Sequence, residues 1–276
     1  AVIVVNVKNG VEVGTLKAWA LCEKYSLPRM IFITNMDFDN ASFRKITEDL
    51  TEQFGKKIAP IHFPIRENEK FTGYVNVVKK AGRKWLEKGQ KEECPIPEYL
   101  DEYLEKYRET LLEAVAETSE EFMDRYFAGE EFSVHEIMMA LTQNVSSGDI
   151  VPVAMGSPVQ LRGVANLLDD IVQYFPSPDK RSVAGINTKT NEIFEANYDF
   201  AKAKSAQVFK TIVDPFIGKY SMIKVKSGVI KSDDVIFNID KDAEQKLNKL
   251  YVFEGSKPIE IPELHAGDIG AIAKLD

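Results

Sequence analysis

The chain has 276 residues, which is long for a single hydrophobic core and predicts two domains. Apolar residues make up 44% and charged residues 28%, as in soluble globular proteins, and no stretch approaches the roughly 18 to 20 apolar residues of a membrane span. The net charge of −8 argues against non-specific binding to nucleic acid, and no basic-then-apolar leader opens the sequence, so we expect a cytoplasmic protein.

The cysteines and histidines form no reactive or metal-binding pattern in the sequence. Cys22 and Cys94 are far apart, and we expect two free thiols in a reducing compartment. His62, His135 and His265 each lack a second histidine or a cysteine at ligand spacing. We therefore expect structural or surface histidines rather than catalytic ones.

The first 37 residues predict a strand, a helix and a second strand. AVIVVNV is a nearly continuous apolar run, typical of a strand buried on both faces. We expect Thr15 to cap the helix that follows, and Pro28 to end it before a strand from Met30 to Ile33. This β-α-β unit implies parallel strands. Because the sequence opens directly on a strand, we expect an excised fragment of a longer protein.

Further helices and strands continue the pattern. An apolar stripe at helical spacing predicts a helix over 40–54, capped by Asn40 or Ser42. IAPIHFPI predicts an edge strand because it contains two prolines, and FTGYVNVV predicts another strand. Residues 97–129 are strongly helical, and Ser133 is placed to cap a further amphipathic helix.

The α/β pattern returns at VPVAMGS, which predicts another buried strand before the helix GVANLLDDIVQYF. Residues of about 60–145 are therefore expected to form an inserted α+β subdomain within an α/β domain over 1–180. From residue 183 onward, apolar and polar residues alternate in several short segments with turn signals between them. This pattern predicts an all-β barrel over 183–276.

The negative charge is concentrated in one segment. Residues 87–131 contain 15 acidic and 5 basic residues, a net charge of −10, while the rest of the chain is about +2. The segment is expected to be a solvated helix face or a docking face for a basic or helical partner.

Polar residues follow two of the predicted parallel strands. Thr34-Asn35-Met36-Asp37 ends one strand, and Gly156-Ser157-Pro158 ends another. Ligands of open parallel sheets bind at the carboxyl ends of strands, although an aspartate there is more often a turn residue. The two segments together predict a binding site.

Short motifs occur in a consistent order along nearly the whole chain. They are GVEVGT, LPR before the second strand, Met36-Asp37 with NASF after it, GSPVQLRGVANLLDDIVQYFPSP, and in the barrel VDPFIGK, SGV and AGDI. In this order they resemble elongation factor G and its relatives, including the tetracycline-resistance ribosomal protection proteins. The resemblance implies a partial P-loop GTPase domain with an inserted subdomain, followed by a barrel of the translation-factor domain II type.

The resemblance also implies an activity: a translational GTPase that acts on the ribosome with GTP and Mg²⁺. The phosphate loop GxxxxGK[ST], which holds the phosphates and a Mg²⁺ ligand, does not occur in this sequence. We therefore expect GTP and Mg²⁺ in the parent protein, and neither nucleotide binding nor GTP hydrolysis by this chain alone.

In the family, a motif Asn-Lys-x-Asp reads guanine. Its Asp accepts hydrogen bonds from the guanine N1–H and N2–H₂, its Lys stem covers the base, and its Asn ties the loop to its neighbours. Aligned on Met36, these residues fall on Asp37, Asn35 and Thr34. The guanine discriminator is therefore retained, while the two supporting residues are replaced.

The second base-facing loop departs from the family as well. The family's Ser-Ala-x falls on Ser157, Pro158 and Val159, and the alanine N–H that donates to guanine O6 falls on a proline. Proline has no N–H, and a lost hydrogen bond of this kind costs about 1 to 3 kcal/mol. We hypothesise that the parent reads guanine weakly or with relaxed specificity.

The remaining family functions imply partners. The barrel resembles the domain that contacts ribosomal RNA, and Lys219, Lys224, Lys226 and Lys231 around its turns are candidates for meeting phosphates. The acidic insert resembles the subdomain that contacts the ribosomal stalk protein. Three alternatives remain open: a GTPase of the elongation factor G type, a tetracycline-protection protein, and a non-hydrolysing ribosome-binding module with a degraded pocket.

Overall fold

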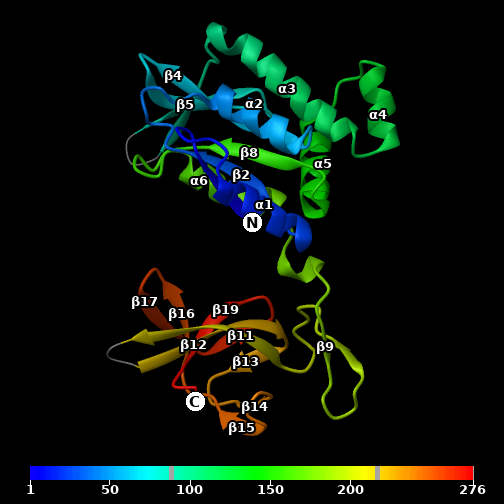
Figure 1. The fold of residues 1–276 in the computed structure, drawn as a ribbon, viewed down its shortest axis with the longest axis vertical. Coiled ribbons are helices and arrows are strands. Elements are labelled where there is room, and N and C mark those ends of the chain that lie inside the picture. Colours follow the sequence, from blue (N-terminus) through cyan, green and yellow to red (C-terminus); the bar gives the residue numbers. More distant parts are fainter. Residues whose placement is uncertain (87–89, 215–217, 276) are drawn as a thin grey trace. The chain divides into compact units, whose positions relative to one another are not determined.

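A computed structural model describes residues 1–86, 90–214 and 218–275. Within them the chain forms two compact units, Ala1–Pro176 and Ser177–Asp276 (Figure 1). Residues 87–89 of the acidic segment and 215–217 of the VDPFIGK motif lie outside the described residues. None of the helices in the described part is long and apolar enough to cross a membrane.

A four-stranded parallel sheet lies at the centre of the first unit. Its strands, in spatial order, are β1 (Val2–Asn6), β2 (Met30–Thr34), β8 (Val151–Met155) and β3 (Ile58–Pro60). Every residue of β2 and β8 is buried, which explains their continuous apolar sequences. The expectation that the first strand is buried on both faces is wrong, because β1 is an edge strand and Val4 is 60% exposed.

Three helices follow strands of this sheet: α1 (Val13–Lys24) after β1, α2 (Phe43–Phe54) after β2 and α6 (Val164–Tyr174) after β8. A fourth, α5 (Val134–Ser147), precedes β8. Ser42 and Ser133 accept hydrogen bonds from the first turns of α2 and α5, so both expected caps are confirmed. The expected cap Thr15 is wrong. The first helix begins at Val13, three residues earlier than expected. Its N-cap is Glu12, and the Thr15 hydroxyl accepts from the Glu12 backbone N–H instead.

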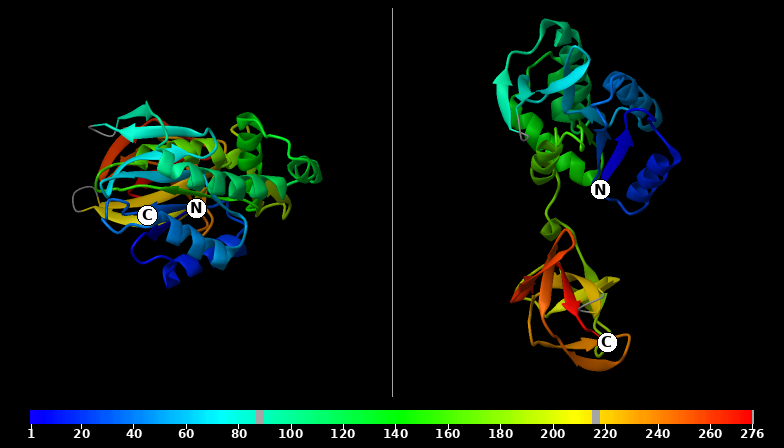
Figure 2. Two further views of the ribbon diagram at one scale, coloured as in Figure 1. Left: turned by 90° about the horizontal axis from the view of Figure 1, so that it is seen from above. Right: turned by 90° about the vertical axis from the view of Figure 1, so that its left-hand side faces the viewer.

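A second, antiparallel sheet follows the first along the chain, in the order β4 (His62–Glu67), β5 (Lys70–Asn76), β6 (Ala81–Trp85) and β7 (Lys91–Cys94). IAPIHFPI is therefore two strands rather than one, and each is an edge strand of its own sheet. Ile61 joins them, because its N–H bonds to Val153 of the parallel sheet and its carbonyl accepts from Val77. Both views in Figure 2 place β1 and α1 on the opposite side of the unit from these strands.

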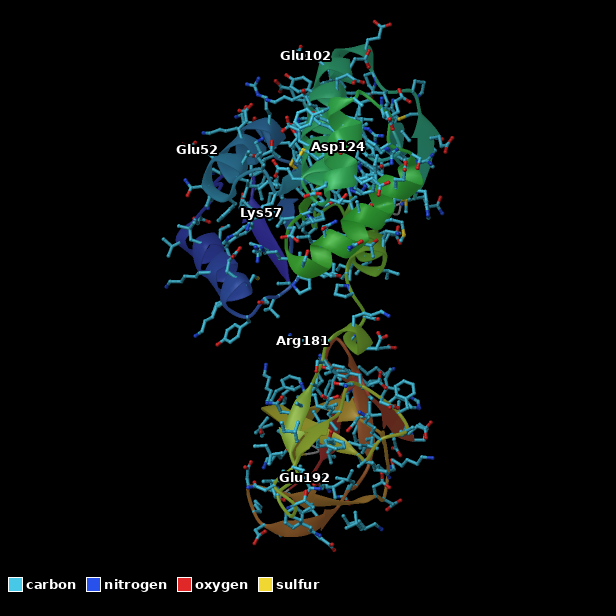
Figure 3. All side chains as sticks on the ribbon, turned by 90° about the vertical axis from the view of Figure 1, so that its right-hand side faces the viewer. Glu52, Lys57, Glu102, Asp124, Arg181 and Glu192 are labelled. Carbon is cyan, nitrogen blue, oxygen red and sulfur yellow. The ribbon has the colours of Figure 1, made fainter. Side chains whose placement is uncertain are left out.

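The acidic segment forms a short helical turn, η2 (Glu98–Leu100), and the helices α3 (Asp101–Ala116) and α4 (Glu120–Phe127). Tyr107 of α3 packs against Phe43 and Phe63, whereas no residue of α4 is buried. Figure 3 labels Glu102 on α3 and Asp124 on α4, both of which are exposed. The buried residues of both sheets and of α3 belong to one hydrophobic cluster, so the segment between β3 and β8 shares its core with the parallel sheet.

The second unit is built from antiparallel strands. Its main sheet has the order β11 (Ser205–Asp214), β12 (Gly218–Ser227), β19 (Ile269–Ala273), β16 (Leu250–Glu254) and β17 (Lys257–Ile261). The short turn η3 (Pro178–Lys180) precedes three two-stranded pairs: β9 (Ala184–Ile186) with β10 (Ile193–Glu195), β13 (Val229–Lys231) with β18 (Glu263–His265), and β14 (Val235–Asn238) with β15 (Ala243–Lys246). The period-2 segments of the sequence are thus confirmed as strands.

Candidate functional site

The two polar strand ends lie side by side at the carboxyl edge of the parallel sheet. β2 and β8 are neighbours, with Ile33 opposite Met155. Beyond the last pair, the Met36 N–H donates to the Gly156 carbonyl at 3.1 Å, and the Gly156 N–H donates to the Ile33 carbonyl at 2.9 Å. The structure therefore brings the two predicted segments together.

The loop after β2 presents an unpaired carboxylate oxygen. Asn35 adopts a left-handed backbone conformation with φ +65°, which asparagine tolerates better than most residues, and the Phe38 N–H closes the turn onto its carbonyl. Asp37 is half-buried, and its Oδ1 is fully buried with no hydrogen-bond partner among the described residues. An unpaired buried acceptor is costly, so a donor that reached this oxygen would relieve that cost.

Asp37 lies on a cavity of about 610 Å³. The walls are the loop after β1, the loop after β2 and the first turns of α2. The lining residues are Val7, Lys8, Asn9, Gly10, Asp37, Phe38, Asp39, Asn40, Ala41, Ser42, Lys45, Ile46 and Asp49. Of the seven predicted site residues, all of them described, Asp37 alone lines the cavity; Thr34, Asn35, Met36, Ser157, Pro158 and Val159 do not.

Sequence reasoning missed the loop after β1, which forms one wall. Asn6 organises this loop, because its side-chain Oδ1 accepts from the Lys8 N–H at 2.9 Å and its carbonyl accepts from the Gly10 N–H. Gly10 has φ +73°, a conformation that glycine adopts without strain. The Asn9-Gly10 pair was the available signal, since this dipeptide marks a turn after a strand.

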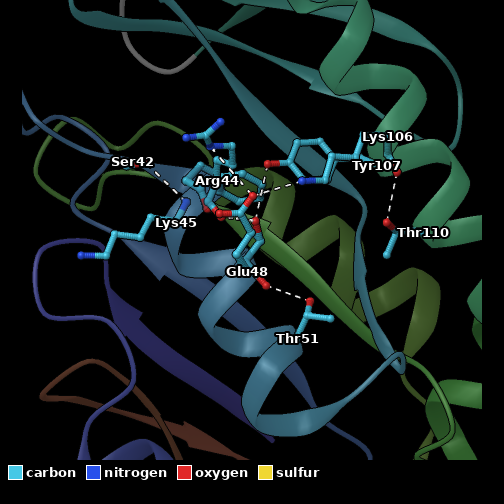
Figure 4. Close-up of polar contacts among 10 residues, drawn as sticks. Ser42, Arg44, Lys45, Glu48, Thr51, Lys106, Tyr107 and Thr110 are labelled. Atoms are coloured by element: carbon cyan, nitrogen blue, oxygen red, sulfur yellow. Dashed lines mark hydrogen bonds and ion pairs between the residues drawn. The ribbon is translucent and has the colours of Figure 1, made fainter.

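The opposite wall is the start of α2. Ser42 caps this helix by accepting from the Lys45 N–H (Figure 4). Glu48 pairs with Lys106 of α3 at 3.1 Å and with Arg44 at 3.9 Å, whereas the Lys45 side chain extends away from this group. Lys45 therefore adds a positive charge to the cavity wall, where Asp39 and Asp49 add negative charges.

The loop after β8 is closed on itself. Ser157 is completely buried and exchanges backbone hydrogen bonds with Arg162 at 2.8 and 3.0 Å, and its hydroxyl accepts from the Gln160 N–H. Pro158 and Val159 are exposed at the tip. Gly163 is required here, because a Cβ on it would lie 2.5 Å from the Met155 carbonyl oxygen.

Contacts that support the first loop come from elsewhere in the unit. The Thr34 carbonyl accepts from the Val7 N–H at 3.1 Å, but its hydroxyl makes no hydrogen bond in the part of the chain that the structure describes. Arg66 of β4 donates to the carbonyls of Met36 and Phe38 at 2.7 and 2.9 Å. This arginine is a second residue of the site that sequence reasoning missed.

The described residues contain no group of three or more His, Cys, Asp or Glu side chains arranged to hold a metal ion. The site as described thus offers hydrogen-bonding groups at the carboxyl edge of a parallel sheet and a cavity beside them. Asp37 is an acceptor that this site offers to the hydrogen-bond donors of a ligand, because its Oδ1 has no partner among the described residues.

Comparisons with known proteins agree with this architecture. The family model for the elongation factor Tu GTP binding domain matches residues 1–177, and the model for elongation factor G domain 2 matches residues 203–276. The two matches follow the division into an α/β unit and an all-β unit, and confirm the expected fold class.

A solved structure is similar over almost the whole chain. It is a crystal structure of a protein from Thermus thermophilus, with 30% sequence identity and a TM-score of 0.80. The match covers 98% of this chain and 38% of that one, so the chain spans well under half the length of the protein it resembles. The chain belongs to the translational GTPases of the elongation factor Tu and elongation factor G type.

Proposed function

We propose that the chain is the guanine-reading and barrel portion of a ribosome-acting GTPase of the elongation factor G type. In this proposal residues 1–180 are the GTP-binding domain, about 60–145 its inserted subdomain, and 183–276 the barrel domain. The observation that carries it is the buried, unpaired Oδ1 of Asp37 beside the 610 Å³ cavity. GTP with Mg²⁺ supplies the hydrolysable phosphates in this family.

The chemistry of recognition follows from the edge of the base. A carboxylate accepts two hydrogen bonds at once, and guanine presents N1–H and N2–H₂ side by side. Adenine presents an acceptor at N1 and no amino group at C2, so Asp37 would repel it. Because β2 and β8 are adjacent, the loop with Ser157, Pro158 and Val159 follows the neighbouring strand, and the resemblance implies that this loop faces guanine O6.

Three residues that differ from the family's motifs favour weak binding of guanine or low selectivity for it. Thr34 and Asn35 stand in place of the Asn and Lys implied by the resemblance, and Pro158 offers no N–H. A second candidate function, a ribosome-binding module with a degraded pocket, is favoured by the same departures.

The proposed macromolecular partners use two other surfaces. In the barrel unit the amines of Lys224 and Lys226 lie 5.3 and 5.9 Å from the centroid of the buried Tyr198 ring, and we propose that these two cations meet RNA phosphates. These two lysines lie within β12 rather than around turns. In the acidic segment, α4 has no buried residue and is proposed as the contact for the ribosomal stalk protein.

Substitution of Asp37 tests the assignment of the base. In the complete protein, we expect Asp37→Asn to lower the affinity for GDP and to raise that for xanthosine diphosphate. The asparagine amide would donate to the xanthine O2 while its oxygen still accepts from N1–H, whereas it would face the guanine amino group with its own NH₂. The expected changes are about 10- to 100-fold in each direction, measured by displacement of a fluorescent nucleotide.

Asp39→Asn is the matched control, because Asp39 lines the same cavity two residues further along. We expect it to leave the ratio of guanine to xanthine affinity unchanged. If Asp37→Asn also leaves that ratio unchanged, Asp37 does not read the base, and the proposed function loses its support.

A further inference from the structure

The loop that carries Asp37 is held from outside by one guanidinium group. Arg66 Nη1 donates to the Met36 carbonyl at 2.7 Å, and Nη2 donates to the Phe38 and Asp39 carbonyls at 2.9 and 3.2 Å. These three carbonyls flank Asp37 on both sides. A planar arginine fork can satisfy several acceptors in one fixed geometry, which a lysine amine cannot do.

The position of Arg66 is itself fixed. It lies in β4 opposite Phe71 of β5, next to an irregularity in the register of that strand pair. Its own carbonyl accepts from the Tyr99 hydroxyl at 2.6 Å, and Nη2 also donates to the carbonyl of Glu69. The guanidinium is therefore anchored in the second sheet while it reaches the loop of the first.

The strand partner of Arg66 also holds the loop after β8. Arg162 of that loop donates to the carbonyl of Phe71, which is the strand partner of Arg66. Both loops at the carboxyl edge of the parallel sheet are thus attached to one point of the antiparallel sheet.

The charges around Arg66 favour this arrangement. Burial lowers the pKa of the Arg66 guanidinium, and the carboxylates of Asp39, Glu69 and Asp37 oppose that shift. An arginine stays protonated under these conditions.

We propose that Arg66 is a positioning residue for base recognition, which holds the backbone of residues 36–39 so that the Asp37 carboxylate faces the cavity. It supplies from the second sheet the support that the loop lacks locally, since the Thr34 hydroxyl makes no hydrogen bond in the described part of the chain. This inference rests on the proposed function. If Arg66 holds the loop in this way, the Asp37 carboxylate keeps its position even though Thr34, Asn35 and Pro158 depart from the family.

The test measures discrimination between GDP and inosine diphosphate, which lacks the 2-amino group that Asp37 reads. In the complete protein, we expect Arg66→Gln to lower the ratio of GDP to inosine diphosphate affinity by about tenfold or more, because a misplaced carboxylate loses its charge-assisted hydrogen bond. Arg66→Lys should give an intermediate ratio, since an amine reaches fewer of the three carbonyls at once. Affinities are measured by displacement of a fluorescent nucleotide.

Arg83→Gln is the matched control. Arg83 lies in β6 of the same sheet and pairs with Glu93, away from the loop. We expect it to keep the wild-type ratio. A purely structural role of Arg66 would instead weaken both nucleotides equally or lower only the thermal stability.

The outcomes separate this inference from the proposed function. Wild-type protein that does not distinguish GDP from inosine diphosphate would overturn both. Wild-type discrimination that survives in Arg66→Gln, or in a folded Arg66→Lys if Arg66→Gln does not fold, would overturn the positioning role and leave Asp37 as the reader of guanine.

Discussion

Pro158 is the residue whose replacement should repair the pocket most directly. It is exposed at the tip of the loop after β8, so an alanine there meets no packing obstacle. Pro158→Ala restores a backbone N–H at the position implied to face guanine O6. We expect the affinity of the complete protein for GDP to rise by about 5- to 150-fold, the range for one hydrogen bond to a buried acceptor.

The nucleotide of 2-aminopurine provides the control for this prediction, because it keeps the amino group and lacks O6. Its affinity should stay constant in Pro158→Ala. Val159→Ala, a change at the exposed neighbour that keeps its N–H, should alter neither affinity. An equal gain for both nucleotides would mean that the loop changed shape rather than gained a donor.

At the scale of single residues, sequence predicts those parts of a site that local spacing fixes. The place of Asp37 at the end of a buried strand was predictable from the sequence, whereas its role in reading guanine is implied only by the resemblance. Arg66 was not predictable, because it lies in another sheet and its contacts are to backbone carbonyls, which leave no mark on the residue types of the loop. The cavity wall at Lys8 to Gly10 was missed because its contribution is mainly backbone conformation.

Between the elements α6 and β4 lies a buried pair of titratable groups. His62 Nδ1 is 3.4 Å from Asp170 Oδ2, and His62 Nε2 faces the Asn76 amide nitrogen at 3.1 Å. The Lys79 N–H donates to the Asn76 side-chain oxygen, so the Asn76 NH₂ group must point toward His62. Because that NH₂ group is a donor, His62 Nε2 accepts its hydrogen bond and carries no proton. Burial, with Lys91 and Lys79, lowers the pKa of His62 to about 3. Burial, with Asp169, raises the pKa of Asp170 to about 7.

These shifts act on stability in opposite directions. The folded pKa of His62 lies below its usual 6.5, so its contribution to the free energy of unfolding is lost as the pH falls from 6.5 toward 3. The folded pKa of Asp170 lies above its usual 3.8, so the stability that Asp170 contributes is fully present below pH 3.8 and is lost as the pH rises through 7. Each slope is at most about 1.4 kcal/mol per pH unit.

Single variants should separate the two contributions. Relative to wild type, we expect Asp170→Asn to become more stable as the pH rises from about 4 to 7, and His62→Gln to become more stable as the pH falls from 6.5 toward 4. Urea unfolding across this range measures both, and comparison with wild type cancels the other titrating groups. A constant offset for both variants at every pH would contradict the prediction.

At the scale of elements, periodicity predicted the helices and most strands, since each carries an apolar face. β6 and β7 were missed because their sequences, AGRKW and KEEC, carry charged residues and no clear apolar alternation; β7 is the largely exposed edge strand, and β6 beside it is partly buried. The split of IAPIHFPI into two strands was missed as well. Nothing in its composition marks Ile61, whose two backbone groups bond to different sheets.

For the whole molecule, the two units have separate hydrophobic clusters. The first cluster lies entirely within 1–176, and the other two lie within 183–276. Each unit therefore has its own core, as an independently folding domain requires. The segment between them, 177–182, is exposed throughout and contains only the short turn η3.

This organisation predicts where a protease cuts first. Trypsin should cleave after Lys180 or Arg181, because both are exposed and the side-chain contacts of Asp179 with Ser177 and Lys180 in that turn are exposed as well. Mass spectrometry over a time course should show two persistent fragments that meet at this point, and each should keep a cooperative thermal transition. The double variant Lys180→Gln with Arg181→Gln should delay the first cut without changing either transition. If the first fragments instead ended within α3 or the β4–β7 sheet, the prediction would be wrong. The first unit would then unfold locally more readily than the segment 177–182 is cleaved.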